Sequence, residues 1–239
     1  NNYAHMFGAK SNNREEYEKV VERWAKALKY LGANVMMPTV AVYSQAIYPS
    51  SQIDKIHSSR HIPDYFKMMA NVAEKYDLKI IADFHRTSSE LSIMFKGQTD
   101  PRRNWAVDKN GNYLNANNND ETYPLLNPIY PTNKEWLERW VAEFANRYKN
   151  MPAFAGISIR TMGWLNHGLN NFQSLNYGYD DYTGQQFSDY LGIADPGTPQ
   201  ARFATFTSAP YKQQWIDWRG AQIHGIYENL VDVARSVKP

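Results

Sequence analysis

Residues 14–43 read REEYEKVVERWAKALKYLGANVMMPTVAVY, and the order of the two patterns within them decides the fold. The first pattern repeats at helical spacing, with residues 11–13 as candidate N-caps and Gly32 as the stop. The second, over 33–43, is a short apolar run typical of a strand buried in a parallel sheet. The apolar positions of the predicted helix are Tyr17, Val20, Val21, Trp24, Ala27, Leu28 and Leu31.

The same alternation recurs along the chain. Further helices are predicted at about 62–76, 133–148 and 212–237, and buried strands at 78–85 (LKIIADFH) and 154–161 (FAGISIRT). A short apolar segment at 2–9, NYAHMFGA, predicts one more strand ahead of the first helix. This β-α-β-α-β-α-β-α order predicts parallel strands joined by right-handed crossovers.

Two architectures have this order, an open doubly wound sheet and a (β/α)8 TIM-type barrel. No G-x-G-x-x-G motif follows the first strand, and long loops follow the later strands, as in barrel enzymes. We therefore expect an α/β protein of the barrel type, a single domain over residues 1–239 with about four β-α units. Because four units make half a barrel, we expect a C-terminal continuation of the protein, a homodimer partner or the chain's own insertions to cover the open face.

Two long insertions separate the predicted units, at residues 87–127 and 162–211. In the first, Asn110-Gly111 lies between WAVDK and NYL and predicts a two-residue hairpin turn. The second is rich in Gly, Asn and Tyr and contains a short predicted helix at 181–191. Loops of this length are usually lids or binding loops, so both are candidates for substrate contact.

Composition excludes several classes of function. A net charge of +2 leaves no cation excess for nucleic acid, and the absence of Cys excludes disulfides, thiolate metal sites and Cys nucleophiles. No apolar run approaches the length of a membrane span. The 14% aromatic content, with 17 Tyr and 7 Trp, suits either a sugar-binding cleft or a large core.

The ends of the third and fourth predicted strands carry the polar residues of greatest chemical interest. Alternation places Asp83 and His85 on one side of the third strand, where they could act as acid and base or bind a divalent metal. The fourth strand ends at Arg160, followed by Trp164, a pair suited to clamping and stacking on a ligand. The structural alternative is that Arg160 or Arg86 pairs with Asp83 and that His85 is an ordinary rim residue.

Four further residues are candidates for substrate contact. Asp180 and Asp181 begin the short predicted helix, where capping is the expected role of at least one of them. His5 lies at the end of the first predicted strand and Tyr43 in the ring-rich segment at the end of the second, where both would line the same face. Spacing alone provides no third metal ligand, so neither a metal nor an organic cofactor is expected.

Three stretches carry a resemblance to a known family: residues 125–164 (LLNPIYPTNKEWLERWVAEFANRYKNMPAFAGISIRTMGW), 178–193 (GYDDYTGQQFSDYLGI) and 215–230 (WIDWRGAQIHGIYENL). Together they resemble secreted bacterial glycoside-hydrolase-like (β/α)8 barrels. The resemblance implies a carbohydrate-active protein acting on an oligo- or polysaccharide, located outside the cell, at its surface or in the periplasm of a bacterium.

One departure from that family bears on catalysis. Many retaining glycosidase barrels have an Asn-Glu pair at the end of the fourth strand, whereas this chain has Arg160-Thr161. Glycoside hydrolysis ordinarily needs two carboxylates, and here Asp83 is the one at a strand end, with Glu90, Asp180 and Asp181 in loops. Three hypotheses therefore stay open: a glycoside hydrolase using Asp83 with Arg160, a non-catalytic carbohydrate-binding or assembly module, and a metal-dependent hydrolase using Asp83 and His85.

Overall fold

The computed structural model describes residues 14–42, 45–53, 55–56, 63–84, 99–113, 126–159, 172 and 174–238. Within them the helices are α2 (Arg14–Tyr30), α3 (Tyr65–Lys75), α5 (Pro131–Tyr148), α6 (Asp181–Leu191), α7 (Pro199–Phe206) and α8 (Lys212–Val237), with a 3-10 turn, η1, at Pro101–Asn104. The strands are β1 (Val35–Met36), β2 (Thr39–Val42), β3 (Gln45–Ala46), β4 (Lys55–Ile56), β5 (Lys79–Phe84) and β6 (Phe154–Ile159).

The sheet is largely parallel, as predicted, with β5 at its centre. One side of β5 pairs in parallel with β1 and β2, and the other side pairs in parallel with β6. Strand β3 is antiparallel to β2, and β4 runs parallel to β3. The order of parallel strands along the chain matches the predicted second, third and fourth units, while the predicted first strand at 2–9 lies outside the described residues.

The second predicted strand is not continuous. It is divided into β1 and β2 around Pro38, with a shift in register against β5 between Thr39 and Ala41. Proline has no backbone N–H to donate to the ladder, which accounts for the break. The chain nevertheless stays beside β5, because the backbone N–H of Asp83 donates to the Pro38 carbonyl at 2.9 Å.

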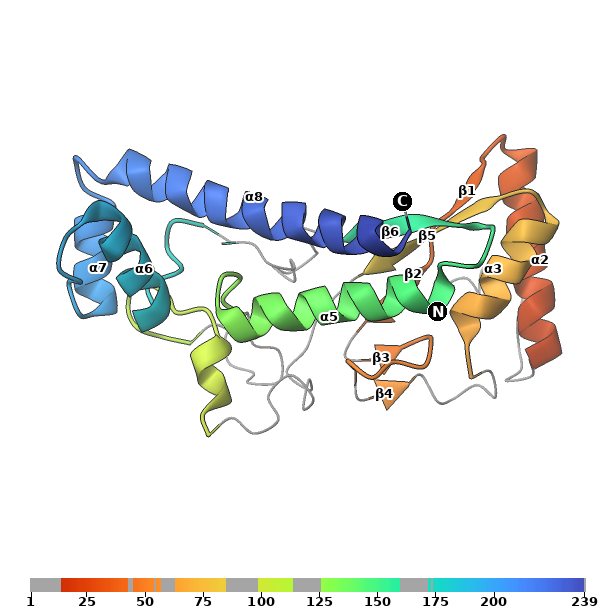
Figure 1. Cartoon of the computed structure of the whole chain (residues 1–239), viewed down its shortest axis with the longest axis horizontal. Helices are drawn as coiled ribbons and strands as arrows, with labels where there is room; N and C mark the ends of the chain where they lie inside the picture. The colour runs from red at the N-terminus through yellow and green to blue at the C-terminus, as the bar shows by residue number, and fades with distance from the viewer. Residues whose placement is uncertain are drawn as a thin grey trace.

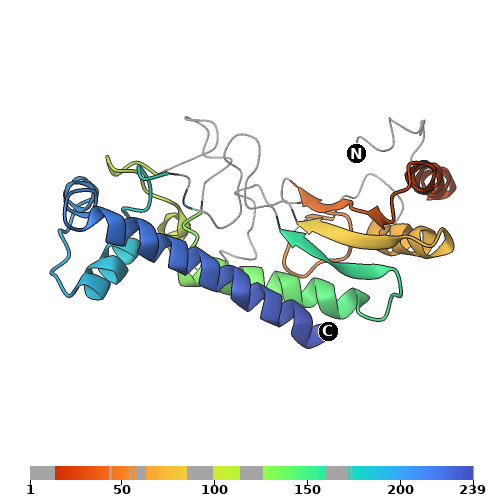
Figure 2. The same cartoon turned by 90° about the horizontal axis from the view of Figure 1, so that it is seen from above.

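Helices cover one face of the sheet. In Figures 1 and 2, α5 and α8 run side by side along one side of the strands, and α2 and α3 pack together near the start of β1 and β5. Alternate residues of β5, namely Ile80, Ala82 and Phe84, are fully buried against this helical layer. Among the described residues, no helix combines the length and the apolarity that crossing a membrane requires.

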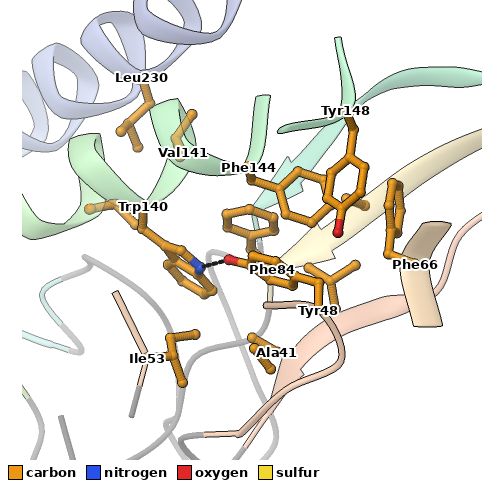
Figure 3. Packing of buried hydrophobic residues seen from close by; sticks show 14 of the residues in the cluster. Ala41, Tyr48, Ile53, Phe66, Phe84, Trp140, Val141, Phe144, Tyr148 and Leu230 are labelled. Atoms are coloured by element: carbon orange, nitrogen blue, oxygen red, sulfur yellow. Dashed lines mark hydrogen bonds between the residues drawn. The ribbon is translucent and has the colours of Figure 1, made fainter. Parts of the chain in front are cut away.

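The core between sheet and helices is built from aromatic rings (Figure 3). The ring of Phe84 lies 4.3 Å from that of Trp140 and 5.1 Å from that of Phe144, centroid to centroid. The indole N–H of Trp140 donates to the Tyr48 hydroxyl at 2.6 Å. The polar groups of these two side chains are therefore hydrogen-bonded to each other inside the core. Much of the aromatic content therefore fills the core, as one reading of the composition proposed.

The segments that follow β5 and β6 fold together as one body, residues 99–113 and 174–211, which we call the inserted unit. The backbone N–H of Gly178 donates to Val107 O at 2.9 Å, and that of Lys109 donates to Asn176 O at 2.8 Å. Helices α6 and α7 lie in this unit and pack on the N-terminal turns of α8 through Phe187, Phe206 and Trp215. The described parts of the two insertions therefore pack together, which the sequence did not predict.

The turn at Asn110-Gly111 is one residue longer than the two-residue turn that the sequence predicts. Val107 and Tyr113 form an antiparallel bridge, and the N–H of Asp108 donates to Asn112 O at 3.0 Å, so three residues, 109–111, form the turn. Gly111 takes a positive φ of 89°, as this turn requires. The Asp108 carboxylate accepts from the N–H groups of Asn110 and Asn112, each at 2.8 Å, which stabilises the longer turn.

Candidate functional site

The carboxyl ends of β5 and β6 point toward the inserted unit (Figure 1). In parallel α/β folds this is the end at which ligands bind, because the loops that leave it surround a common space. The candidate functional site is therefore the sheet face at these strand ends, on the side opposite the helices.

Asp83 lies on that face, where the sequence predicted it. Its neighbours Ala82 and Phe84 point to the helices, so alternation turns Asp83 the other way. The carboxylate is buried, with 1% of the residue exposed, and its Oδ2 accepts a hydrogen bond from the Thr39 hydroxyl at 3.0 Å. Asp83 is the only acidic residue in the described strands.

A second neighbour extends this polar row across three strands. Ser158 of β6 is the register partner of Asp83, and Thr39 of β2 is its partner on the other side. Register partners in a sheet share a face, so Thr39, Asp83 and Ser158 form a row on the face opposite the helices. Thr39 and Ser158 were not among the predicted site residues, although each is a polar residue in a mostly apolar strand.

Several predicted site residues lie outside the described residues: His5, Tyr43, His85, Arg160 and Trp164, together with Glu90 and Arg86. Their placement beside Asp83 remains a prediction. The proposed metal pair of Asp83 and His85 also includes one of them. Within the described part of the chain, no group of three or more His, Asp or Glu residues is arranged to hold a metal ion.

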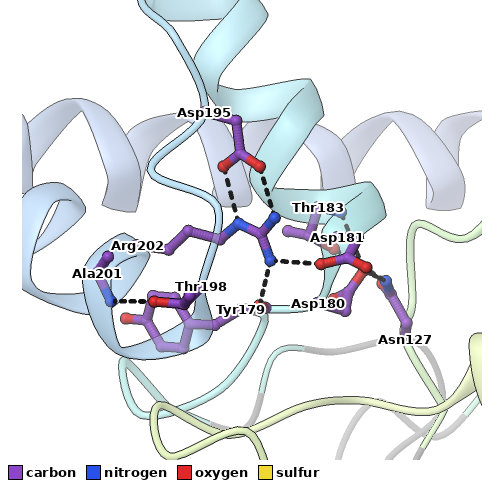
Figure 4. A network of polar contacts seen from close by, with 9 residues as sticks. All are labelled: Asn127, Tyr179, Asp180, Asp181, Thr183, Asp195, Thr198, Ala201 and Arg202. Carbon is purple, nitrogen blue, oxygen red and sulfur yellow. Dashed lines mark hydrogen bonds and ion pairs between the residues drawn. The ribbon is translucent and has the colours of Figure 1, made fainter.

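Asp180 caps helix α6, as the sequence analysis expected of one of the two aspartates (Figure 4). Its Oδ1 accepts from the backbone N–H of Thr183 at 2.9 Å and from the side-chain amide of Asn127 at 2.9 Å. The same amide donates to the Thr183 hydroxyl at 2.8 Å. Asp180 therefore joins the end of the first insertion to the start of α6, and burial raises the pKa of its carboxyl.

Asp181 points away from this cap and binds Arg202 (Figure 4). Its side chain is 94% exposed, and its Oδ1 lies 2.8 Å from Nη1 of Arg202. Asp195 accepts from the Nε and Nη2 atoms of the same guanidinium, at 2.8 and 2.5 Å, in a bidentate pair. Arg202 lowers the pKa of Asp195, and the two carboxylates raise the pKa of Arg202. Within the described residues, these contacts give Asp180 and Asp181 roles inside the inserted unit.

Arg219 is a second buried arginine, with a different environment. Its guanidinium carbon lies 4.3 Å from the ring centre of Phe172 and 4.9 Å from that of Trp215, and Nη2 donates to Ser174 O at 2.7 Å. Burial lowers its pKa to about 10. Phe172 and Ser174 belong to the chain that returns from the loop after β6, so Arg219 holds that return against α8.

No protein-family model matches the chain, and no curated protein matches it in sequence. Solved structures with a similar fold include three bacterial β-galactosidases. The enzyme of the psychrophilic Marinomonas ef1 has a TM-score of 0.55 at 12% identity, over 92% of this chain and 34% of that one. The enzyme of Rahnella sp. R3 has 0.55 at 16%, over 95% and 33%.

The enzyme of Bacillus circulans sp. alkalophilus has a TM-score of 0.56 at 14% identity, over 95% of this chain and 34% of that one. The chain thus spans about a third of the length of each of these structures. At identities this low the likeness concerns the fold alone. The chain has an α/β fold that is similar to part of each β-galactosidase structure.

Proposed function

We propose that the protein is a glycoside hydrolase in which Asp83 is a carboxylate of the reaction and Arg160 orients it. The observation that carries the proposal is the position of Asp83, a buried acid at the carboxyl end of the central strand, on the face that no helix of the described chain covers. The fold shared with β-galactosidases supports a carbohydrate substrate, and β-galactosides are the first class to test. The complete (β/α)8 barrel, the polysaccharide substrate and an extracellular or periplasmic location in a bacterium belong to the same proposal.

Glycoside hydrolysis requires two carboxyl groups with different roles. A protonated acid must donate to the glycosidic oxygen as the bond breaks, and a carboxylate must stabilise the positive charge that develops on the sugar or activate water. Asp83 can take either role, because it is held in one orientation by the Thr39 hydroxyl. A second carboxylate must come from another part of the protein, since Asp83 is the only acid in the described strands.

The test compares the wild type with Asp83→Asn on a panel of β-galactosides and bacterial and plant polysaccharides. Asparagine keeps the shape of the side chain but can neither ionise nor act as an acid, so hydrolysis should fall by about 10²–10⁴-fold. Asp77→Asn is the matched control, because Asp77 is a fully exposed carboxylate in a turn after α3. Unchanged hydrolysis in Asp83→Asn, with native circular dichroism in both variants, would remove Asp83 from the mechanism.

A non-catalytic carbohydrate-binding or assembly module is the second candidate. It is favoured by the single strand-end carboxylate of the described sheet, since one acid is too few for the usual mechanism. Glycan-array binding by the protein, with no product released from the bound glycan, would support the module over the hydrolase.

A further inference from the structure

Ser158 differs from the other members of the polar row because its hydroxyl has no hydrogen-bond partner among the described residues. Thr39 donates to Asp83, whereas no hydrogen bond joins the Ser158 side chain to any other described residue. The residue is half-buried, and the register of β5 and β6 places it beside Asp83 on the same face. A serine hydroxyl can donate one hydrogen bond and accept two, and the described residues use none of this capacity at Ser158.

Within the described residues, β6 also has free space on this face two residues before Ser158. Gly156, two residues earlier on β6, is the register partner of Ile81 and lies on the same face as Asp83 and Ser158. A Cβ built at Gly156 meets no described atom within 4 Å. Because glycine has no side chain, a sugar ring could approach the backbone of β6 at Gly156, close to the Ser158 hydroxyl.

We propose that Ser158 is a substrate-binding residue that hydrogen-bonds a sugar hydroxyl beside the carboxylate of Asp83. Neighbouring strands are about 4.8 Å apart, so a sugar bound at Ser158 would lie next to Asp83. A polyhydroxylated ligand suits the pair, because the serine can both donate and accept while the carboxylate accepts. This inference rests on the proposed function and extends it to a named contact.

The experiment exchanges Ser158 for threonine and for valine, which have the same shape and differ only in the hydroxyl. Both are β-branched and suit a strand, so both variants should melt at about the wild-type temperature. With lactose as the probe, Ser158→Val should raise KM, or Kd where there is no turnover, by about 2- to 10-fold, the size expected for one lost neutral hydrogen bond. Ser158→Thr should stay close to the wild type, and so should the control Ser236→Ala on the exposed side of α8.

The outcomes separate this inference from the function on which it rests. If Asp83→Asn abolishes hydrolysis while Ser158→Val and Ser158→Thr share one KM, Ser158 does not contact the substrate and the hydrolase proposal stands. If the wild type neither binds nor hydrolyses lactose or the polysaccharides, the carbohydrate function fails and the role of Ser158 fails with it. If Ser158→Val and Ser158→Thr raise KM equally, the larger side chain is the cause and the missing hydroxyl is not. That result also overturns the inference.

Discussion

At the scale of single residues, Asp180 links the pH of the solution to the stability of the inserted unit. Its Oδ1 accepts two hydrogen bonds, while Oδ2 is buried with no donor among the described residues. Burial is the main cause of its raised pKa, so the folded state holds this proton more tightly than the unfolded state. The contribution of Asp180 to stability is therefore fully present below the ordinary pKa of 3.8 and is lost as pH rises through the folded-state pKa.

Asp180→Asn removes this titration and keeps the oxygen that caps α6. We expect the wild type to gain stability relative to the variant as pH falls from about 7 toward about 4, because only the wild type takes up the proton. Urea unfolding at a series of pH values measures the difference. Two curves that stay parallel across that range would show that Asp180 does not titrate differently on folding.

Arg202 allows a second test, since two carboxylates of different exposure bind one guanidinium. The side chain of Asp195 is 16% exposed and that of Asp181 is 94% exposed. Removing the charge of Asp195 should cost about 3–5 kcal/mol of unfolding free energy, because it leaves the buried Arg202 short of its bidentate partner. Asp181→Asn should cost only about 0.2–1 kcal/mol, as for other exposed pairs.

Chemical denaturation of Asp195→Asn and Asp181→Asn, side by side, checks this expectation. Equal losses in the two variants would mean that burial does not set the strength of the pair. The sequence predicted Asp181 as a site residue because the spacing of residues 181, 195 and 202 does not reveal that their side chains meet.

Asp83 could be predicted from the sequence, whereas its neighbours could not. A polar residue at the end of an apolar run marks the strand end, and alternation then gives its face. Thr39 and Ser158 became candidates only once the register of β2, β5 and β6 was known. Register depends on packing between strands that are far apart in the sequence, which a single strand's pattern does not encode.

At the scale of secondary-structure elements, the helices were predicted more closely than the strands. Helices α6 and α8 have the predicted bounds, because Asp180 and Gly192 supply a clear cap and stop for α6 and a long periodic pattern supplies α8. Helix α7 was missed: it has eight residues and only two of them, Arg202 and Phe206, are buried, so it lacks an apolar stripe. The break at Pro38 was missed because the apolar run continues through it.

Two helical glycines in these elements predict opposite effects of the same substitution. A Cβ at Gly184 of α6 would overlap the Nε and Cδ atoms of Arg202, whereas a Cβ at Gly220 of α8 meets no described atom within 4 Å. Gly220→Ala should stabilise the protein by about 0.5–1 kcal/mol through helix propensity. Gly184→Ala should destabilise it by about 1–3 kcal/mol, because Arg202 must give up its contacts with Asp195.

Thermal unfolding of the two variants measures both effects against one wild type. A gain in melting temperature for Gly184→Ala would mean that Arg202 moves aside without loss, and that the buried pair contributes little.

At the scale of the whole molecule, the sheet lies toward one end and the inserted unit toward the other, joined by α5 and α8 (Figure 2). Among the described strands, β6 lies at an edge of the sheet. It pairs with β5 on one side, and no described strand pairs with its other side. Residues 156–159 of β6 are half-exposed, although strands of parallel sheets are normally buried on both faces.

An open edge of this kind carries unpaired backbone N–H and C=O groups and is a template for another strand. The Lys238 ammonium caps the start of β6, where it donates to Phe154 O at 2.7 Å. Leaving about 400 Å² of apolar surface in water forfeits on the order of 10 kcal/mol, which is comparable with the stability of a domain.

We therefore expect the 239-residue chain, prepared by itself, to cover this edge by association. Light scattering should give a mass above the 27.7 kDa of one chain, rising with concentration. A cooperative monomer that binds no hydrophobic dye over the same range would mean that the edge is already covered within the chain, and that the half-barrel expectation is wrong.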